Sequence, residues 1–266
     1  TGLYNTIVGG NALKTNVDGD HNTAIGYLAL EDFEADADGG GHNTAVGSSS
    51  QLNASTGEYN TSLGSLSMGV GVATGDYNVA LGYKAGEYIT SGTQNTIIGS
   101  FAGDALTEGS SNVAIGYGAM SSANGTESRN IAIGQFALFQ LNDNGNNYNT
   151  AVGYAAGENI TTGIKNTLLG GLAGDALTTG EGNVTVGQSA LSSTTVGSDN
   201  VALGKEALTG NVNGSASIAI GSLALQDQAP TGTGNIYNVA IGHHAGKEIT
   251  TGTENTIIGG LAGDAL

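Results

Sequence analysis

Carboxylate side chains recur in this sequence and could do chemistry, and the chemistry that they suggest is calcium binding. Five of them crowd a single run, at Glu31, Asp32, Glu34, Asp36 and Asp38. Calcium takes oxygen ligands, which carboxylates and turn carbonyls supply. The nonapeptide calcium-roll pattern Gly-Gly-x-Gly-x-Asp is absent from the sequence. We therefore interpret the acidic residues as a solvated face, with calcium as the only cofactor that they suggest and this run as the place to look for it.

The four histidines, His21, His42, His243 and His244, are the other side chains that could act as bases or metal ligands. No spacing among them and the abundant Ser and Asp residues singles out a Ser-His-Asp triad or a metal-binding set. An enzyme built on a β-helix also needs a charged cleft, of which the sequence gives no sign. We expect these histidines at turns and on the surface, and we expect no catalysis.

A five-residue frame, Asn-x-x-aliphatic-Gly, determines the elements that must position these side chains. It returns fifteen times, at intervals of mostly 17 or 18 residues, and only the frame at Ser217 lacks Asn. A short period that runs from end to end is typical of a solenoid, in which each unit stacks on its neighbours. The sequence predicts an all-β parallel β-solenoid of about fifteen coils, in a single domain over residues 1–266. Representative frames are Asn5 to Gly9, Asn22 to Gly26, Asn112 through Ile115 to Gly116, and Asn200 to Gly204.

Positions +1 to +3 of each coil, counted from the frame Asn as position zero, have the pattern of a strand. Position +1 is Thr, Val or Ile, position +3 is always Val, Ile or Leu, and position +2 is mostly Ala. Alternate side chains of a strand point to opposite faces, so both faces of this strand are apolar. We expect both faces to be buried, one inside the coil and the other against a second sheet or another chain. Another chain is the preferred cover, which predicts a homo-oligomer.

Glycine and large aliphatic residues recur at fixed places outside the strand. Position −3 is Gly in twelve coils and Glu127, Asn146 or Asn235 in the others, which predicts a left-handed backbone there. The frame Gly at +4 has no substitute and indicates a bend or a close contact. Position +8 is Leu or Met in eight coils and Gly in six, and Ile or Leu follows each of those Gly residues three positions later. We expect one large side chain per coil in the core.

Extra residues lengthen three coils, and we expect them to form outward loops at 31–41, 141–147 and 226–234. Neither end of the sequence carries a polar capping segment, and an uncapped solenoid end exposes a strand edge. A two-coil block also recurs three times, and its last copy stops at the final residue. We expect part of a longer fibre, or subunits that stack end to end into a filament.

Composition narrows the classes of partner. The net charge is −17, from 23 acidic residues against six Lys and Arg. Nucleic acid and anionic lipid surfaces both require a cationic stripe, which six scattered bases cannot form. No apolar run approaches the roughly 20 residues of a membrane span. The sequence has no Cys, and a Cys-free chain is indifferent to the oxidants outside a cell.

Two repeated side chains could bind a ligand at the surface. Thr recurs at +1 in eight coils and suggests an ice-binding array of hydroxyls, but Val or Ile interrupts it in seven. We interpret this column as a buried β-branched ladder, and the frame Asn residues as stacked amides that bond between coils. Tyr recurs at −1 and could contact a glycan or a host surface, or pack over an edge with its hydroxyl in water. The Tyr candidates are Tyr59, Tyr77, Tyr148 and Tyr237.

Frames such as Asn112-Val-Ala-Ile-Gly116 and Asn200-Val-Ala-Leu-Gly204 resemble the head repeats of YadA-like trimeric autotransporter adhesins, and related repeats occur in phage tail fibres. The resemblance covers all fifteen coils, although the period here is longer by a few residues. It implies a left-handed parallel β-roll assembled as a trimer, at a cell surface or in a tail fibre. We expect a structural extracellular fibre or adhesin shaft that mediates surface attachment. The alternative is a ligand-binding solenoid, either ice-binding or binding glycans through calcium.

Overall fold

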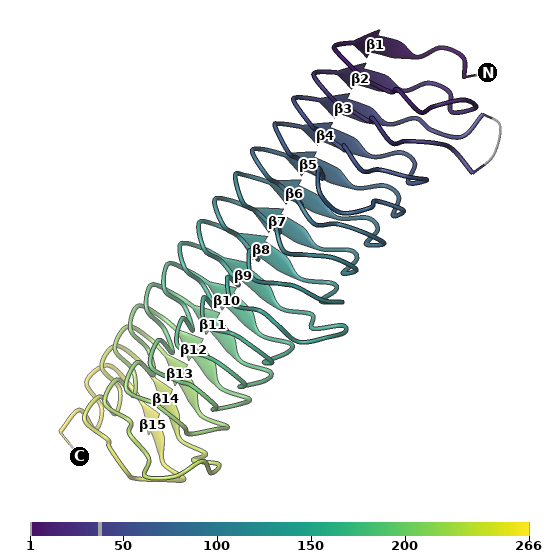
Figure 1. The fold of residues 1–266 in the computed structure, drawn as a ribbon. Helices are drawn as coiled ribbons and strands as arrows, with labels where there is room; N and C mark the ends of the chain where they lie inside the picture. Colours follow the sequence, from purple (N-terminus) through teal and green to yellow (C-terminus); the bar gives the residue numbers. More distant parts are fainter. Residues whose placement is uncertain (1, 37–38, 266) are drawn as a thin grey trace. The chain divides into compact units, whose positions relative to one another are not determined.

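The computed structural model describes residues 2–36 and 39–265, and every regular element within them is a β-strand of three residues. One strand forms in each coil, at positions +1 to +3 of the frame (Figure 1). The prediction of an all-β parallel solenoid of about fifteen coils is therefore confirmed. The strands are Thr6–Val8 (β1), Thr23–Ile25 (β2), Thr44–Val46 (β3), Thr61–Leu63 (β4), Val79–Leu81 (β5), Thr96–Ile98 (β6), Val113–Ile115 (β7), Ile131–Ile133 (β8), Thr150–Val152 (β9), Thr167–Leu169 (β10), Val184–Val186 (β11), Val201–Leu203 (β12), Ile218–Ile220 (β13), Val239–Ile241 (β14) and Thr256–Ile258 (β15).

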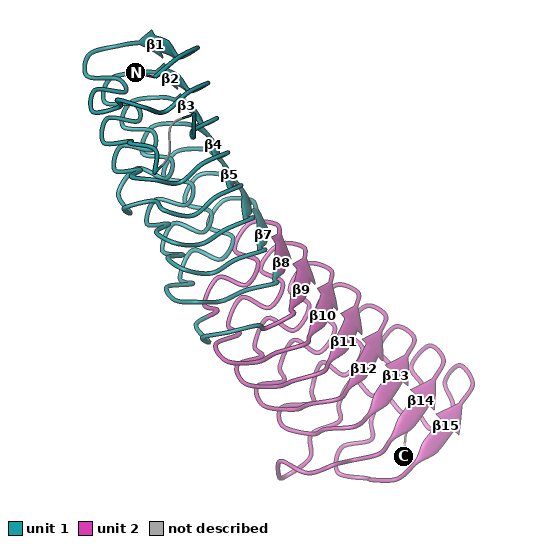
Figure 2. Cartoon of the chain, turned by 90° about the vertical axis from the view of Figure 1, so that its right-hand side faces the viewer, with its two compact units in different colours: residues 1–130, 142–146 teal, residues 131–141, 147–266 magenta. Residues whose placement is uncertain are grey.

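The chain divides into two compact units, coloured separately in Figure 2. The first holds residues 1–130 with 142–146 and carries β1 to β7, and the second holds residues 131–141 with 147–266 and carries β8 to β15. Within each unit consecutive strands pair in parallel and in register, as β1 with β2 and β9 with β10 illustrate. Every frame position therefore forms a straight column along its unit.

The core of each unit is thin and is built from positions +2, +7 and +8. Ala45 at +2 and Ala29 at +7 have no exposed surface, and neither has Met68 at +8. Positions +1 and +3 point outward instead, and the +3 side chain of Leu63 is 51% exposed. In the single chain only the +2 face of the strand is buried, and the expected burial of the other face against another chain remains a prediction. A coil of about 17 residues encloses only one side of its strand, because the opposite side has no second layer.

The Gly that replaces a large residue at +8 makes room for the aliphatic side chain that follows. A Cβ added to Gly86 would lie 2.8 Å from Cδ1 of Ile89, and one added to Gly174 would lie 2.9 Å from Cδ1 of Leu177. Ile89 and Leu177 are fully buried. The expected conservation of one large core side chain per coil is confirmed in these coils, while Leu266 lies outside the described residues.

The prediction of a left-handed backbone at position −3 is wrong. Left-handed φ values occur at −1, +6 and +8, mostly in residues other than Gly, such as Tyr4 (φ 60°), Leu28 (φ 60°) and Leu30 (φ 51°). Gly is needed at −3 because coils approach closely there, and a Cβ on Gly75 would lie 2.0 Å from the carbonyl oxygen of Gly92. The frame Gly at +4 is needed both for its positive φ and for the close approach of the next coil. Gly153 has φ of +142°, and a Cβ on it would lie 2.5 Å from the nearest backbone atoms.

Three polar residues that break the core pattern meet one another in the interior. Ser50 and Ser62 place their hydroxyl oxygens 2.5 Å apart, and Gln51 donates from Nε2 to Oγ of Ser62 at 2.9 Å. All three are fully buried. A polar side chain in this core is thus tolerated when a neighbouring coil supplies its partner.

Candidate functional surfaces

The frame Asn residues form a buried ladder of amides that joins successive coils. Oδ1 of Asn60 accepts the backbone N–H of Asn78 at 2.8 Å and its Nδ2 at 3.1 Å. Nδ2 of Asn60 donates to the carbonyl oxygen of Gly75 at 2.9 Å. The same pattern recurs along both units, for example from Asn183 to Asn200. These hydrogen bonds satisfy buried polar groups, so the frame Asn has a structural role.

In the one coil whose frame lacks Asn, a side chain from the insertion of that coil makes hydrogen bonds in place of the missing amide. Ser217 is too short to reach the next coil, and Gln228, fully buried, takes the vacant place. Nε2 of Gln228 donates to Oγ of Ser217 at 3.1 Å, and its Oε1 accepts Nδ2 of Asn238 at 2.9 Å. The 226–234 insertion thus completes the ladder, a role that the sequence pattern did not reveal.

The outward face of the sheet is an uncharged strip of Thr and aliphatic residues, which we call the strand face and define as positions +1 and +3. In unit 1 the +1 column begins with four Thr in register, of which the first and last are exposed and the middle two half-buried. In the single chain this column is therefore only partly covered, and its burial as a β-branched ladder against another chain remains a prediction. The four residues are Thr6, Thr23, Thr44 and Thr61.

Position −1 carries a continuous stack of rings in unit 1. The five rings of this stack have centroids 4.8 to 5.1 Å apart and interplanar angles of 6° to 15°. Tyr59 is stacked on both faces, so it can offer a ligand only its edge and hydroxyl, and Tyr77 is stacked on one face. Such stacking is a favourable aromatic arrangement in itself. The rings belong to Tyr4, His21, His42, Tyr59 and Tyr77.

Unit 2 holds the other two Tyr candidates, which are about half exposed. Tyr148 is 50% and Tyr237 54% accessible to solvent. The hydroxyl of Tyr237 accepts Nδ2 of Asn235 at 2.6 Å. Neither residue belongs to the ring stack of unit 1.

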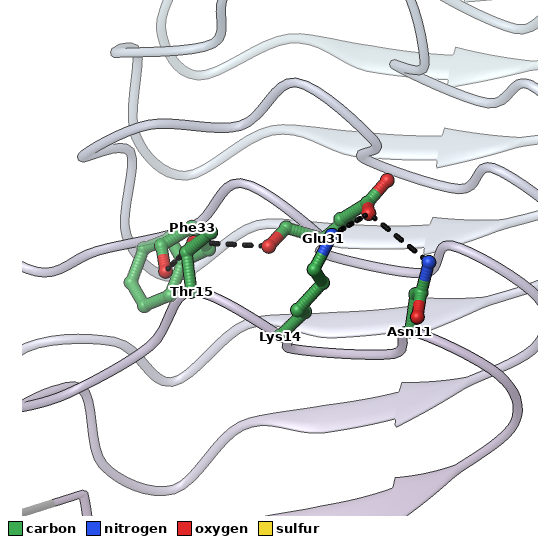
Figure 3. A network of polar contacts seen from close by, with 5 residues as sticks. All are labelled: Asn11, Lys14, Thr15, Glu31 and Phe33. Carbon is green, nitrogen blue, oxygen red and sulfur yellow. Dashed lines mark hydrogen bonds and ion pairs between the residues drawn. The ribbon is translucent and has the colours of Figure 1, made fainter.

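The acidic run after Glu31 is used for bonds between coils. Glu31 contacts Nζ of Lys14 at 3.1 Å and Nδ2 of Asn11 at 3.4 Å, and Thr15 donates to the carbonyl oxygens of Glu31 and Phe33 (Figure 3). Each partner comes from the preceding coil, so this network fastens the loop to the unit.

The other carboxylates of that run that the structure describes are engaged separately or exposed. Glu34 accepts the backbone N–H of Val17 at 2.8 Å and that of Asp18 at 3.2 Å. Asp32 and Asp36 are exposed, and Asp38 lies outside the described residues. Among the residues that the structure describes, no group of three or more His, Cys, Asp or Glu is placed to hold a metal ion.

Other acidic side chains also serve the scaffold. Asp76 accepts the backbone N–H of Glu58 at 2.8 Å, and Asp104 accepts the hydroxyl of Ser121 at 2.6 Å. Burial raises the pKa of Asp175 above its ordinary value, and the negative charge of Glu158 raises it further. One oxygen of Asp175 is buried without a hydrogen-bond partner, although the residue as a whole is half-buried.

Glu127 is the carboxylate whose surroundings differ most from a solvated face. It stands at −3, where its carbonyl oxygen accepts Nδ2 of Asn112 at 2.7 Å as a Gly carbonyl does in other coils. Its side chain is fully buried, with Oε2 accepting the backbone N–H of Gly125 at 2.9 Å and Oε1 lacking a partner. Burial raises the pKa of Glu127, and the nearby charge of Asp143 adds to the shift.

The histidines and one hollow are the features of the described residues that bear on catalysis. The hollow, of about 370 Å³, is lined by Ile249, Thr250, Thr251, Gly252 and Asn255, none of which titrates near neutral pH. His21 and His42 belong to the ring stack, while His243 and His244 lie against each other with centroids 3.9 Å apart.

No helix in the described part of the chain has the length and apolarity to cross a membrane.

Comparison with known proteins does not add a relative to this picture. No protein-family model matches the chain, and searches of the curated proteins and of the solved structures give no match. The conclusions about function therefore depend on the columns, contacts and buried groups described above.

Proposed function

We propose that this chain is the structural shaft of an extracellular fibre or adhesin, and that copies of it associate side by side through the strand face. The observation that carries the proposal is the exposed aliphatic column at +3. Val, Ile or Leu occupies this position in every coil, and no charged residue occurs at +1 or +3. Exposed apolar strips of this kind mark interaction sites.

A second copy of the same chain is the occupant that fits this strip best. The columns repeat once per coil, at the spacing of about 4.8 Å between paired strands. Another copy has the same repeat, so its side chains can interdigitate coil after coil, as they do between paired sheets of identical segments. The face is also free of charge in a chain of net charge −17, so like charges do not oppose its burial. A trimer is the assembly that the resemblance to adhesin head repeats favours.

The role in attachment follows from the same architecture. The Asn ladder and the closely stacked Gly residues give a regular scaffold with little side-chain chemistry of its own. We propose that such a scaffold holds binding groups away from a surface. Tyr148 and Tyr237 are the exposed rings that could contact a host surface or glycan.

The test is the mass of the purified chain in solution, measured by light scattering during size-exclusion chromatography. We expect a multiple of 26.2 kDa, and we expect Leu63→Glu/Leu81→Glu to give monomers with an unchanged circular dichroism spectrum. The control Val72→Glu/Val196→Glu adds the same charges at exposed aliphatic residues outside the strand face. A monomeric parent chain at high micromolar concentration would rule out lateral assembly.

The exposed Thr column favours a second candidate, binding to ice through regularly spaced hydroxyls. Thr23 and Thr44 lie in the middle of that column, so Thr23→Lys/Thr44→Lys should remove thermal hysteresis if this is the function. Lateral assembly would cover the same column. A monomer that inhibits ice growth would therefore support ice binding, whereas a multimer that does not inhibit it would support lateral assembly. Calcium-dependent glycan binding, the other alternative, remains a prediction.

A further inference from the structure

Two departures from the repeat coincide at one turn of unit 1. Glu127 replaces the usual Gly at −3, and the next coil carries the insertion that includes residues 142–146, with the sequence Asn-Asp-Asn-Gly-Asn. The insertion lies directly against the turn, because Ser128 pairs with Asn146 and donates its backbone N–H to the carbonyl oxygen of Gly145 at 2.8 Å. We call Gly125 to Glu127 together with residues 142–146 the Glu127 turn.

The side chain of Glu127 is incompletely satisfied. Oε2 has one hydrogen bond, from Gly125, whereas Oε1 has none although the whole residue is buried. A buried carboxylate oxygen without a partner within the chain is costly, and a proton or a cation would remove that cost. The other orphaned polar atoms, on Asn22, Gln51 and Asp175, belong to neutral amides or to a half-buried acid. Glu127 is the fully buried carboxylate among them.

The neighbours of Glu127 argue for a cation. Asp143 is close enough for its negative charge to oppose ionisation of Glu127, and a divalent cation between two carboxylates removes that repulsion. A second side-chain oxygen lies close to the same turn: a Cβ on Gly125 would lie 2.2 Å from Oδ1 of Asn144 and 3.4 Å from Oε1 of Glu127. Only Gly at position 125 lets Oδ1 of Asn144 approach the turn this closely, where it also accepts the backbone N–H of Thr126 at 3.4 Å.

The kind of cation follows from the donor atoms. The side chains named at this turn offer carboxylate and amide oxygens, and Cys and His are absent from 124–130 and 142–146. Oxygen-only sets suit calcium, which completes six to eight ligands with carbonyls and water, rather than zinc, which prefers nitrogen and sulfur. We propose that the Glu127 turn binds one calcium ion, with Glu127 and Asp143 as carboxylate ligands and Asn144 as an amide ligand. This site is independent of the proposed lateral assembly, because it lies outside the strand face.

The test is a calcium titration of the full chain after treatment with a chelator, followed by calorimetry and by thermal unfolding. We expect saturable binding of one calcium per chain, a rise in melting temperature, and weaker binding of magnesium. Glu127→Gln keeps the shape of the side chain and Asp143→Asn changes a half-buried one, so both should fold. Each should weaken calcium binding at least about tenfold, the lower end of losses seen at metal sites.

Glu108→Gln is the matched control, because Glu108 is an exposed acid of the same unit. It should bind calcium as the parent chain does. The proposal is overturned if the parent chain shows no saturable binding at millimolar calcium, or if Glu127→Gln binds as tightly as the parent. It is also overturned if Glu108→Gln loses affinity to the same extent, since calcium then merely screens the acidic surface. A Glu127→Gln chain that is more stable without any calcium response would identify Glu127 as a buried protonated acid instead.

Discussion

Two insertions interrupt the same repeat, and the molecule accommodates them in opposite ways. The 226–234 insertion contributes Gln228, whose Oε1 accepts Nδ2 of Asn238 as the missing Asn at position 217 would have done, while its Nε2 donates to Oγ of Ser217. Residues 142–146 cover Glu127 but leave its Oε1 without a partner. Both keep the coil-to-coil register, through the Ser215–Asn235 and Ser128–Asn146 bridges.

This difference shows which of the two residues the fold itself explains and which one calls for a partner from outside the chain. Backbone pairing alone does not decide whether an insertion fits, because both insertions pair. The decisive property is whether each buried polar atom finds a partner within the chain. Where every atom is satisfied, as around Gln228, the residue is explained by the fold. Where a charged atom is left over, as at Glu127, an external partner is the simplest explanation.

The largest expected effect contrasts the frame with an insertion. Gly221 has φ of +134°, and a Cβ on it would lie 2.3 Å from the carbonyl oxygen of Gly242, whereas a Cβ on Gly234 meets nothing within 4 Å. We expect Gly221→Ala to lower the free energy of unfolding by about 3 kcal/mol or more. Gly234→Ala should change it by less than about 0.5 kcal/mol. Urea unfolding followed by circular dichroism measures both, and equal losses would show that the insertion is as constrained as the frame.

The second-largest effect on the free energy of unfolding tests whether the amide of Gln228 substitutes for the missing Asn. Gln228→Ala should cost about 2 to 4 kcal/mol, because it opens a cavity, removes the partner of the Ser217 hydroxyl and takes away one of the two hydrogen bonds of Asn238 Nδ2. Ser217→Asn/Gln228→Ala should recover a large part of this loss, since Asn restores the frame. The measurement is again the free energy of unfolding. If the double variant is no more stable than Gln228→Ala, the amide of Gln228 is not a substitute for the missing Asn.

The smallest effect concerns the unpaired carboxylate in the absence of calcium. The raised pKa of Glu127 means that the folded chain holds this proton more tightly than the unfolded chain, whose reference value is 4.5. Its contribution to stability is therefore complete below about pH 4.5 and is lost as the pH rises through the raised value. In chelator at pH 7, Glu127→Gln should exceed the parent chain in stability by about 1 to 2 kcal/mol.

The pH and calcium dependence of this difference sharpen the test. The advantage of Glu127→Gln should vanish below about pH 4.5, and saturating calcium at pH 7 should reverse it. Asp175 is present in both chains, so its own raised pKa cancels in the comparison. A difference that is independent of pH would mean that the substitution acts through packing and not through charge.

The fifteen strands could be predicted from the sequence, because the frame fixes their positions and their period. The orientation of the strand could not. Ala24 at +2 and Ile25 at +3 are both apolar, and size alone suggests that the larger residue lies inside. The interior instead takes Ala at +2 because side chains such as Leu30 at +8 already fill the coil.

The turns and the Glu127 turn were less accessible to prediction. Left-handed φ at Tyr4 or Leu28 contradicts the usual preference of such residues, and only the contacts between coils explain it. Gly75 is required by a neighbouring carbonyl, which a single coil does not contain. The sequence did mark Glu127 as an exception at −3 beside an insertion, but burial and the missing hydrogen bond of Oε1 are visible only in three dimensions.

The left-handed residues have a consequence for how the chain folds. Each non-Gly residue in this conformation costs about 1 kcal/mol, and most coils hold two or three of them. Neighbouring coils hold them in place, as when His21 donates its backbone N–H to Leu3 and Leu28 donates to Gly10. A coil on its own would therefore leave its native conformation. A coil added to one that has already formed is held in that conformation, because the formed coil presents the backbone groups to which it hydrogen-bonds. Folding should accordingly proceed by slow formation of the first few coils and rapid growth from them, so that synthesis from one end is the order of events that suits this chain best.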